Sequence, residues 1–433
     1  MTDPQLRRRL TWIHGTGMAI GSVLGSGVLI LPAVTAQAAG PASILSWLIM
    51  SALAFPMAIT LGNLGARHPH AGGIVEYARL AFGEAMGRVT AWLFLGTIPI
   101  GVPIIALIGA RYVVGTLGMP SGMVPILAGA MLLVSWVMHR QGLAMASWLQ
   151  VLILVLIAAL IVAAIFAAGS HVRLANFYPV VPHGWLPAAK SAIEIFWCFL
   201  GWEMVGHLAE EFRHPERDLR RTFVMAPTLV GVLYMALSVV TVGTHSYGAA
   251  THGAPLSQLV GLGLGHAGSM ITGALALLIT MVAIHGNVAG FSRMVYSQAR
   301  AGVFPRWLGR VHPRRGTPTA ALTALMVDFA VVPAVYSLTR VDLGTLITWP
   351  STVFLVVYII AMASAYKLVA GTRLGRVLPL LPIIVCGALL PFAGWAVIYP
   401  VCLGGVGWMM ARVQKSSAVS VSESHNSHSS LNR

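Results

Sequence analysis

The sequence predicts an all-α polytopic membrane protein, and three observations support that fold class. Only 9% of the 433 residues are charged and 57% are hydrophobic, whereas soluble domains carry about 25% charged residues. Apolar runs of roughly 17 to 25 residues, long enough to cross a bilayer as helices, recur along the chain. The first and the sixth of these runs contain glycines near their middle, which predicts that two of the helices are broken.

Twelve transmembrane helices are expected from these runs. They cover 15–38, 41–64, 89–116, 122–139, 145–168, 189–208, 222–245, 268–297, 318–338, 342–366, 377–393 and 394–412. The last two runs are separated only by Phe392-Ala393-Gly394. The runs define a transmembrane domain at 15–412, preceded by an N-terminal arm at 1–14. A Ser-rich tail at 413–433 follows and is expected to be disordered.

The net charge of +15 follows the expected topology. Of the 27 Lys and Arg residues, 22 lie in the N-terminal arm, the loops on the same side and the C-terminal tail, and Arg293 lies in the eighth run. The four in or near the opposite loops are Arg111, Arg173, Lys190 and Arg340. The positive-inside rule therefore predicts that both termini are cytoplasmic. The charge needs no nucleic-acid partner to explain it.

The first run contains the segment Gly21-Ser22-Val23-Leu24-Gly25-Ser26-Gly27. A broken helix is tolerated at membrane depth only where protein or a wet cavity covers its free backbone groups. Glycines recur every four residues from Gly17 to Gly25, so close helix packing is the alternative interpretation. The pair Ser26-Gly27 breaks that period. We therefore expect an unwound segment around Ser26-Gly27 that binds a substrate, as in a transporter.

The sixth run contains Gly201 near its middle, followed by Glu203. The first and sixth runs are five spans apart, so they cross the membrane in opposite directions. Discontinuous helices at corresponding positions of two oppositely oriented halves indicate the binding site of a transporter. The two halves are expected at about 15–168 and 189–366, with five spans each, and the spans at about 377–412 are added to them.

The two breaks suggest a ligand that carries one negative and one positive charge. A helix that begins after the first break presents N–H groups that attract an anion, and the carbonyls that end the preceding half-helix attract a cation. A zwitterionic amino acid satisfies both. Glu203 is expected either to gate proton coupling near the ammonium or to anchor the broken helix through hydrogen bonds. Phe199 and Trp202 flank the break and are the expected aromatic walls, which favour an uncharged side chain. The sequence assigns no role to Asp328 or His285.

The residues of the apolar runs give little support to other classes of protein. No paired carboxylates, metal-ligand cluster or nucleophile–base set occurs there, so neither an enzyme nor a metal or cofactor site is expected. The three cysteines, Cys198, Cys386 and Cys402, have spacings that suit neither a disulfide framework nor a metal site. A membrane sensor would need a soluble signalling domain, and the sequence contains no run that predicts one.

Five motifs resemble those of the amino acid–polyamine–organocation transporter superfamily. They are Gly25-Ser26-Gly27-Val28, Pro69-His70-Ala71-Gly72-Gly73, Phe199-x-Gly201-x-Glu203, the stretch 208–218 from Leu208-Ala209-Glu210-Glu211 to Asp218, and Ser292-Arg293-Met294-Val295-Tyr296. Within the superfamily, the segments 196–199 and 89–95 resemble the branch of bacterial exporters of L-methionine and branched-chain amino acids. Members that take cationic amino acids keep acidic pocket residues, whereas only Glu203 is seen here, which favours neutral substrates.

The resemblance implies a leucine-transporter-like fold of two inverted five-helix repeats, with substrate between spans 1, 3, 6, 8 and 10. The residues expected to bind substrate are Gly25, Ser26, Gly27, Val28, Phe199, Gly201 and Trp202, with Glu203 as the proton-coupling or gating residue. The expected function is export of methionine, leucine, isoleucine or valine in exchange for protons across a bacterial cytoplasmic (inner) membrane. Spans 1, 2, 6 and 7 would rock against the rest. An uptake permease or exchanger is the alternative, because sequence does not encode direction. The sequence leaves open whether the protein is a monomer or a homodimer.

Overall fold

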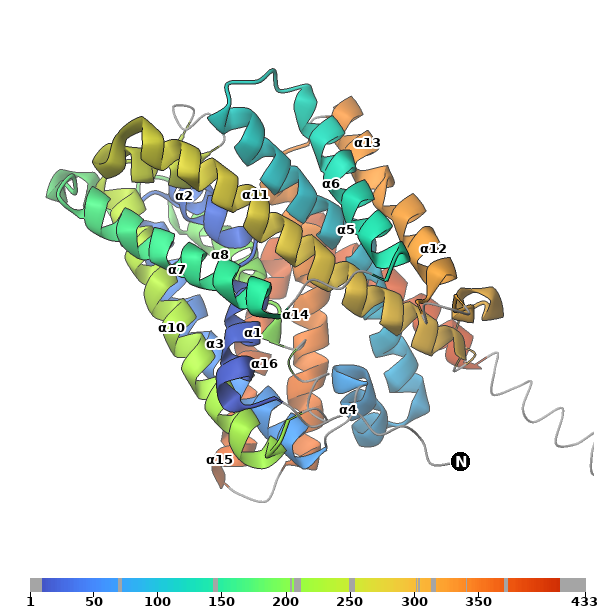
Figure 1. The fold of residues 1–433 in the computed structure, drawn as a ribbon. Helices are drawn as coiled ribbons and strands as arrows, with labels where there is room; N and C mark the ends of the chain where they lie inside the picture. Colours follow the sequence, from blue (N-terminus) through green and yellow to red (C-terminus); the bar gives the residue numbers. More distant parts are fainter. Residues whose placement is uncertain are drawn as a thin grey trace, which may run out of the picture.

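The computed structural model describes residues 10–68, 72–142, 147–202, 205, 212–248, 254–300, 302, 304–312, 317–339, 341–369 and 373–412. These residues form helices and connecting turns (Figure 1). The helices are α1 (Trp12–Val23), α2 (Gly27–Ala39), α3 (Ala42–Arg67), α4 (Gly73–Phe82), α5 (Glu84–Thr116), α6 (Met123–Arg140), α7 (Ser147–Gly169), η1 (Leu174–Phe177), α8 (Trp185–Trp197), α10 (Pro215–Gly243), α11 (Pro255–Arg300), η4 (Arg306–Gly309), α12 (Thr319–Phe329), α13 (Val331–Thr339), α14 (Leu343–Leu368), α15 (Arg373–Val377), α16 (Leu380–Leu389) and η5 (Leu390–Val397). Residues 398–412 are also helical.

The prediction of an all-helical membrane protein is confirmed. Nine helices within the described ranges are long and apolar enough to cross a bilayer, and the shorter apolar helix α2 adds to them. The predicted number of twelve is not confirmed, because 375–412 forms one apolar stretch with a sharp change of direction at Gly394. The predicted arm at 1–14 is described only from residue 10, and the predicted tail at 413–433 lies outside the described residues.

Both predicted helix breaks are present. The first span is helical up to Val23 and resumes at Gly27, so the break covers residues 24–26, slightly earlier than the sequence predicts. In the sixth span, α8 ends at Trp197 and the chain leaves helical geometry before Gly201. Gly201 has a φ of +120°, a backbone conformation that glycine adopts without the steric penalty of a Cβ.

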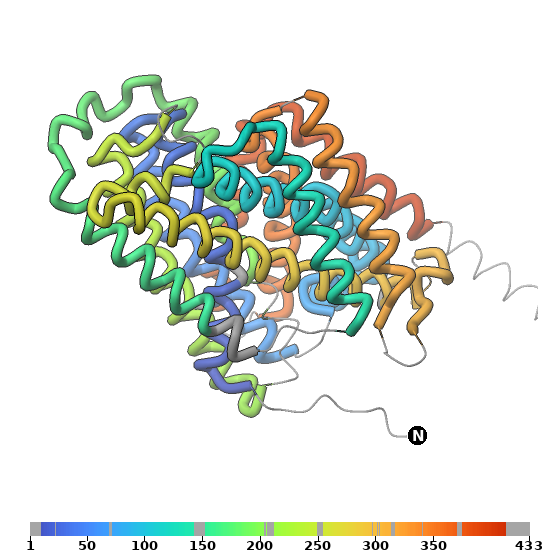
Figure 2. The backbone as a smooth tube through the Cα atoms, turned by 45° about the horizontal axis from the view of Figure 1, so that its top comes forward, coloured from blue at the N-terminus to red at the C-terminus, as the bar shows by residue number. Residues whose placement is uncertain are grey.

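The helices group into two packed assemblies. In one, α3 and α1 pack along α10, and α8 packs against α2 and α3. In the other, α5 lies at the centre and packs against α6, α11 and α14. Figures 1 and 2 show α11 running obliquely across the molecule between α7 and α6. The first assembly contains spans 1, 2, 6 and 7, the same spans that the sequence analysis expects to rock.

Contacts between distant segments define one end of the bundle, which we call the terminal face. There, the Thr222 hydroxyl donates to the Trp12 carbonyl, and the side chains of Arg67 and Arg88 donate to the carbonyls of Val369 and Ala411. The short helix α4 also lies at this end, where Lys367 at the end of α14 donates to the Ala81 carbonyl at 2.6 Å.

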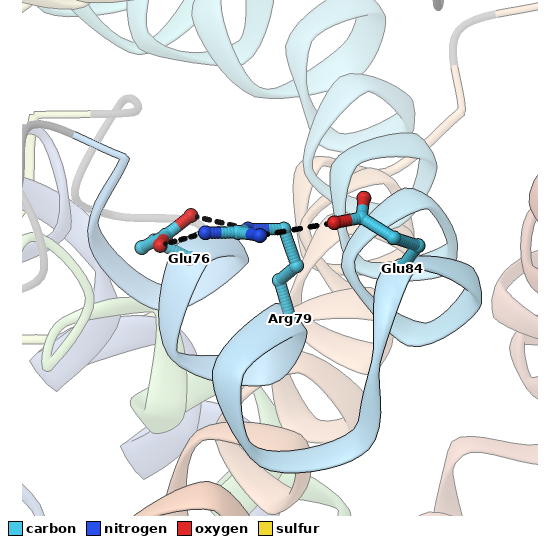
Figure 3. Close-up of polar contacts among 3 residues, drawn as sticks. All are labelled: Glu76, Arg79 and Glu84. Carbon is cyan, nitrogen blue, oxygen red and sulfur yellow. Dashed lines mark hydrogen bonds and ion pairs between the residues drawn. The ribbon is translucent and has the colours of Figure 1, made fainter.

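The helix α4 carries a three-residue ion-pair cluster (Figure 3). The Arg79 guanidinium donates to both carboxylate oxygens of Glu76 and, at 2.9 Å, to Glu84 at the start of α5. Gly83, with a φ of +92°, makes the turn between the two helices. The hydrogen bond with Glu76 raises the pKa of Arg79, so the guanidinium stays charged. The cluster therefore ties α4 to α5 at the terminal face.

The opposite end of the bundle is covered by residues 170–184. The Arg173 backbone N–H and the Asn176 side chain both donate to the Gly243 carbonyl at the end of α10. Nδ1 of His183 lies 3.1 Å from the Ala38 carbonyl at the end of α2. This segment thus closes over the ends of α2 and α10.

Candidate functional site

A cavity lies where the two broken spans meet. Its empty volume is about 670 Å³, including its open mouth. The lining comes from five spans: Val23, Gly25, Ser26 and Gly27 in the first; Thr97, Gly101, Val102 and Ile105 in α5; Trp197, Leu200 and Gly201 in the sixth; Ala283, Asn287 and Phe291 in α11; and Phe354 in α14. These are spans 1, 3, 6, 8 and 10 of the expected topology.

The described part of the cavity wall is neutral. None of the described residues that line it has an ionisable carboxylate, ammonium or guanidinium group. Its polar side chains include Ser26, Thr97 and Asn287, and two of these also bond to their own helices. The Thr97 hydroxyl donates to the Phe94 carbonyl at 2.6 Å, and Nδ2 of Asn287 donates to the Ala283 carbonyl at 2.8 Å. The described wall would therefore meet the charges of a ligand with neutral dipoles.

The beginning of α2 supplies one such dipole. The first N–H groups of a helix have no partner within the helix and carry a partial positive charge. Ser26 occupies the N-cap of α2, yet its side chain makes no capping hydrogen bond, and the residue is 2% exposed. Gly27 follows at the first helical position and also lines the cavity. This geometry suits a carboxylate or another small anion at the start of α2.

Aromatic and small side chains set the width of the cavity. A Cβ at Gly101 would lie 3.5 Å from the Trp197 ring, so glycine at this position leaves room between α5 and the indole. Phe291 and Phe354 add apolar surface from α11 and α14. The Phe354 ring is fixed edge-on against Phe94 at 5.8 Å between centroids. The result is an apolar compartment next to the broken helices.

Four of the predicted site residues meet in this cavity: Gly25, Ser26, Gly27 and Gly201. Three others do not line it, and their packing shows why. Phe199 turns away and packs on Trp47 and Tyr234, at 6.4 and 5.5 Å between ring centroids. Trp202 is fully buried. Val28 faces a smaller cavity between α2, α10 and the start of α11. Trp197 is the aromatic residue of the sixth span that lines this cavity.

The predicted coupling residue Glu203 lies outside the described residues, as do Glu210 and Glu211 of the sequence motif. The two residues to which the sequence assigns no role lie away from the cavity wall. His285 is buried on α11 and stacks on His139 of α6, with 3.9 Å between ring centroids. Asp328 lies on α12. Across the described ranges, no group of three or more His, Cys, Asp or Glu residues could hold a metal ion.

The lining residues of α5, α11 and α14 were not singled out from the sequence. Each belongs to a long apolar helix whose faces are all hydrophobic, so periodicity does not separate the cavity side from the lipid side. One signal was available in α5. Gly101 lies between Pro99 and Pro103, and such a cluster within a membrane helix indicates close approach by another group.

Comparison with known proteins agrees with this geometry. A family model described as amino acid permease matches residues 10–411. The chain is 42% identical over 411 residues to the amino acid permease YecA of Bacillus subtilis (strain 168), covering 95% of this chain and 97% of that protein. It is 32% identical over 418 residues to the L-methionine/branched-chain amino acid exporter YjeH of Escherichia coli (strain K12). This match covers 95% of this chain and 98% of that protein.

A more distant relative is the branched-chain amino acid permease BcaP of Lactococcus lactis subsp. cremoris, 25% identical and covering 80% of this chain and 81% of that protein. Among solved structures, a substrate-bound, outward-open Na⁺-coupled sialic acid symporter superposes with a TM-score of 0.54 at 13% identity. It covers 89% of this chain and 90% of that one, and it supports the fold alone. The match along nearly the whole sequence, together with paired broken helices around a neutral cavity, shows that the chain belongs to the amino acid permease family.

Proposed function

We propose that this permease exports neutral, hydrophobic amino acids, with methionine, leucine, isoleucine and valine as the substrates, in exchange for protons. The single observation that carries the proposal is the neutral cavity at the two helix breaks. A zwitterion brings one charge of each sign, and the start of α2 offers a dipole for its carboxylate. The aromatic and aliphatic wall offers burial to an apolar side chain, worth about 1.5–3 kcal/mol for a residue of this size.

A cationic or acidic substrate fits this cavity poorly. Its extra charge would be transferred from water to a wall without a charged partner among the described residues, and an unpaired buried charge is costly. This cost favours neutral substrates over lysine, arginine or glutamate. The chain matches a relative described as an exporter along 98% of that relative's length, and this similarity favours export over uptake. The likeness to BcaP, described as a permease, keeps uptake as the second candidate.

The distribution of basic residues favours a cytoplasmic location for the terminal face. Most of the Lys and Arg residues lie in segments on that side, in keeping with the positive-inside rule. The assembly of α1, α2, α3, α8 and α10 would rock against the assembly around α5. The cavity between them would then open alternately to the two sides of a bacterial inner membrane.

Everted membrane vesicles test this proposal. Vesicles that contain the protein should accumulate radiolabelled methionine or leucine when a proton gradient is applied, and should accumulate little lysine, arginine or glutamate. A panel of amino acids measured with the gradient in both directions reports substrate, direction and coupling ion together. Accumulation of lysine or arginine in preference to methionine would refute the neutral-substrate proposal. Uptake into right-side-out vesicles alone would establish the permease alternative.

Gly27→Leu is the site variant for the same assay. A side chain at position 27 would meet Sγ of Cys198 at 2.5 Å from its Cβ, so a leucine would displace the residues beside the start of α2 at the cavity. Transport should be abolished while membrane insertion is retained. Gly129→Leu on α6 is the matched control, because a Cβ there has no atom within 4 Å. Normal flux in Gly27→Leu would show that the cavity is not the transport site.

A further inference from the structure

Two polar side chains of the cavity wall come from the assembly around α5. Thr97 lies on α5 and Asn287 lies on α11, and these two helices pack against each other. Ser26, the third polar side chain named above, belongs to the other assembly, at the start of α2. The hydrogen-bonding capacity that each assembly brings to the cavity follows from the bonds that these residues already make.

The amide of Asn287 has a defined orientation. Its Nδ2 atom lies 2.8 Å from the Ala283 carbonyl, one turn earlier on α11, and donates to it. A carbonyl oxygen can only accept, so Nδ2 must lie on this side of the amide and Oδ1 on the other. No other described residue donates to Oδ1, and Asn287 is partly exposed where it lines the cavity. Oδ1 is therefore available as a neutral acceptor.

Thr97 also brings an acceptor to the cavity. Its hydroxyl donates its one proton to the Phe94 carbonyl, at 2.6 Å, within the same helix. With the proton used in this bond, the oxygen can accept a hydrogen bond from a ligand but cannot donate one. The assembly around α5 therefore offers uncharged oxygen acceptors from two neighbouring helices.

The first helix break brings the opposite capacity. The start of α2 presents N–H donors, and the Ser26 side chain does not cap them. At the end of α1, the Val23 carbonyl already accepts from the Tyr234 hydroxyl at 3.1 Å, which uses one of its two acceptor positions. The cavity therefore has donors on α2 and acceptors on α5 and α11, in two different assemblies.

We propose that Asn287 and Thr97 accept hydrogen bonds from the α-ammonium group of the substrate, while the first N–H groups of α2 bind its carboxylate. This inference rests on the proposed function of the cavity, and it adds residues of α5 and α11 to the binding site. An ammonium group has three donors and no acceptor, so neutral oxygens match it without burying a second charge.

This arrangement gives the substrate a structural role. The helix α2 belongs to one assembly, and α5 and α11 belong to the other. A zwitterion held at both charged groups joins the two assemblies across the cavity, whereas a carboxylate or an amine alone contacts one of them. The backbone of the amino acid, and not its side chain, would then favour the closed cavity.

A matched pair of ligands tests the assignment. Desaminomethionine has a hydrogen atom in place of the α-amino group of methionine and keeps its carboxylate and side chain. Isothermal titration calorimetry of the purified full-length protein gives the dissociation constant of each ligand at neutral pH. Asn287→Leu should raise the constant for methionine about ten- to hundredfold, as expected for the loss of a hydrogen bond to a charged group, and should change that for desaminomethionine little. A residue that only shapes the cavity would affect both ligands alike, so equal losses would overturn the inference.

Further variants separate the loss of an acceptor from damage to the fold. Thr97→Val keeps the shape of the side chain and removes its oxygen, so it should also weaken methionine more than desaminomethionine. Asn287→Asp keeps an acceptor oxygen and should retain the preference for methionine that Asn287→Leu loses. Thr272→Val is the matched control on α11, because its buried hydroxyl bonds to the Gly268 carbonyl of its own helix and Thr272 is not among the residues that line the cavity. Equal weakening of both ligands by Thr97→Val, or loss of the preference in Asn287→Asp, would contradict the assignment.

The wild-type protein distinguishes this inference from the proposed function. Binding of methionine by the wild type, together with equal losses for both ligands in the variants, would overturn the roles of Asn287 and Thr97 and leave the proposed function standing. Binding of neither methionine nor leucine by the wild type would refute the proposed function and this inference with it. A larger loss for methionine than for desaminomethionine supports both.

Discussion

Replacing Tyr112 with phenylalanine removes a hydroxyl that joins three segments on the side of the cavity away from the terminal face. Tyr112 lies on α5 and is fully buried. Its hydroxyl donates to the Leu29 carbonyl of α2 and accepts from the Leu256 N–H in the first turn of α11, at 2.8 Å for the second bond. In the proposed rocking motion α2 moves against α5, so the bond to Leu29 must break whenever the cavity opens to that side.

The expected size of the effect follows from which bonds the motion breaks. The bond between Tyr112 and Leu256 joins α5 to the part of α11 that precedes the non-helical turn at Gly265 and does not involve α2, so the movement of α2 against α5 does not itself break it. The bond to Leu29 exists only in the closed state. Such a hydrogen bond contributes a net free energy of about 0.5–1.5 kcal/mol, so its loss corresponds to a two- to tenfold shift of the equilibrium toward the open state. Tyr112→Phe should therefore favour opening by about that factor.

Cysteine labelling measures this shift. Ala33 on α2 is 6% exposed and lines the small cavity beside Leu256, so Ala33→Cys reports separation of α2 from this region. A membrane-impermeant maleimide added from the opposite side should react two- to tenfold faster at position 33 when Tyr112→Phe is present. Tyr77→Phe serves as the control, because its buried hydroxyl has no hydrogen-bond partner among the described residues. An equal or slower labelling rate with Tyr112→Phe would refute the assignment of this bond to the closed state.

Three further predictions concern the coupling residue and the terminal face. Glu203→Gln should remove the pH dependence of flux in vesicles, because it removes the acid expected near the midplane of the sixth span; an unchanged pH profile would assign coupling elsewhere. Lys367→Met should lower the free energy of unfolding by about 1 kcal/mol in thermal melts, because it removes a charged donor at the C-terminal end of α4; an unchanged melting temperature would contradict this. Arg79→Gln should cost less than about 1 kcal/mol, because its ion pairs are solvent-exposed. The raised pKa of Arg79 adds stability that is lost only when pH rises through that pKa, so the cost should be constant across the neutral range.

The predicted site residues that lie at the cavity were chosen from backbone chemistry. Gly25, Ser26 and Gly27 were identifiable because glycine at membrane depth conflicts with the need to pair every backbone group. Gly201 was identifiable for the same reason and because its span is oppositely oriented. These four residues meet at the cavity.

The side-chain walls could not be predicted in the same way. Phe199 and Trp202 flank the sixth-span break, as does Trp197, and nothing in their spacing tells which aromatic faces the cavity once the helix has ended at residue 197. The positive φ of Gly201 turns the chain between Phe199 and Trp202, so helical spacing does not relate their directions. Asn287 and Phe354 lie on helices that are apolar on all sides, so their contribution appears only when the spans are packed together.

The neutrality of the described cavity wall has an electrical consequence. A zwitterionic substrate carries no net charge, so its own transfer across the bilayer does no work against the membrane potential. In the proposed exchange the proton is the only species on which the potential acts, at about 2.3 kcal/mol per elementary charge for each 100 mV. Each exported amino acid would then draw one positive charge inward. Export by this permease should thus be measurable as a current whose reversal potential follows the pH difference.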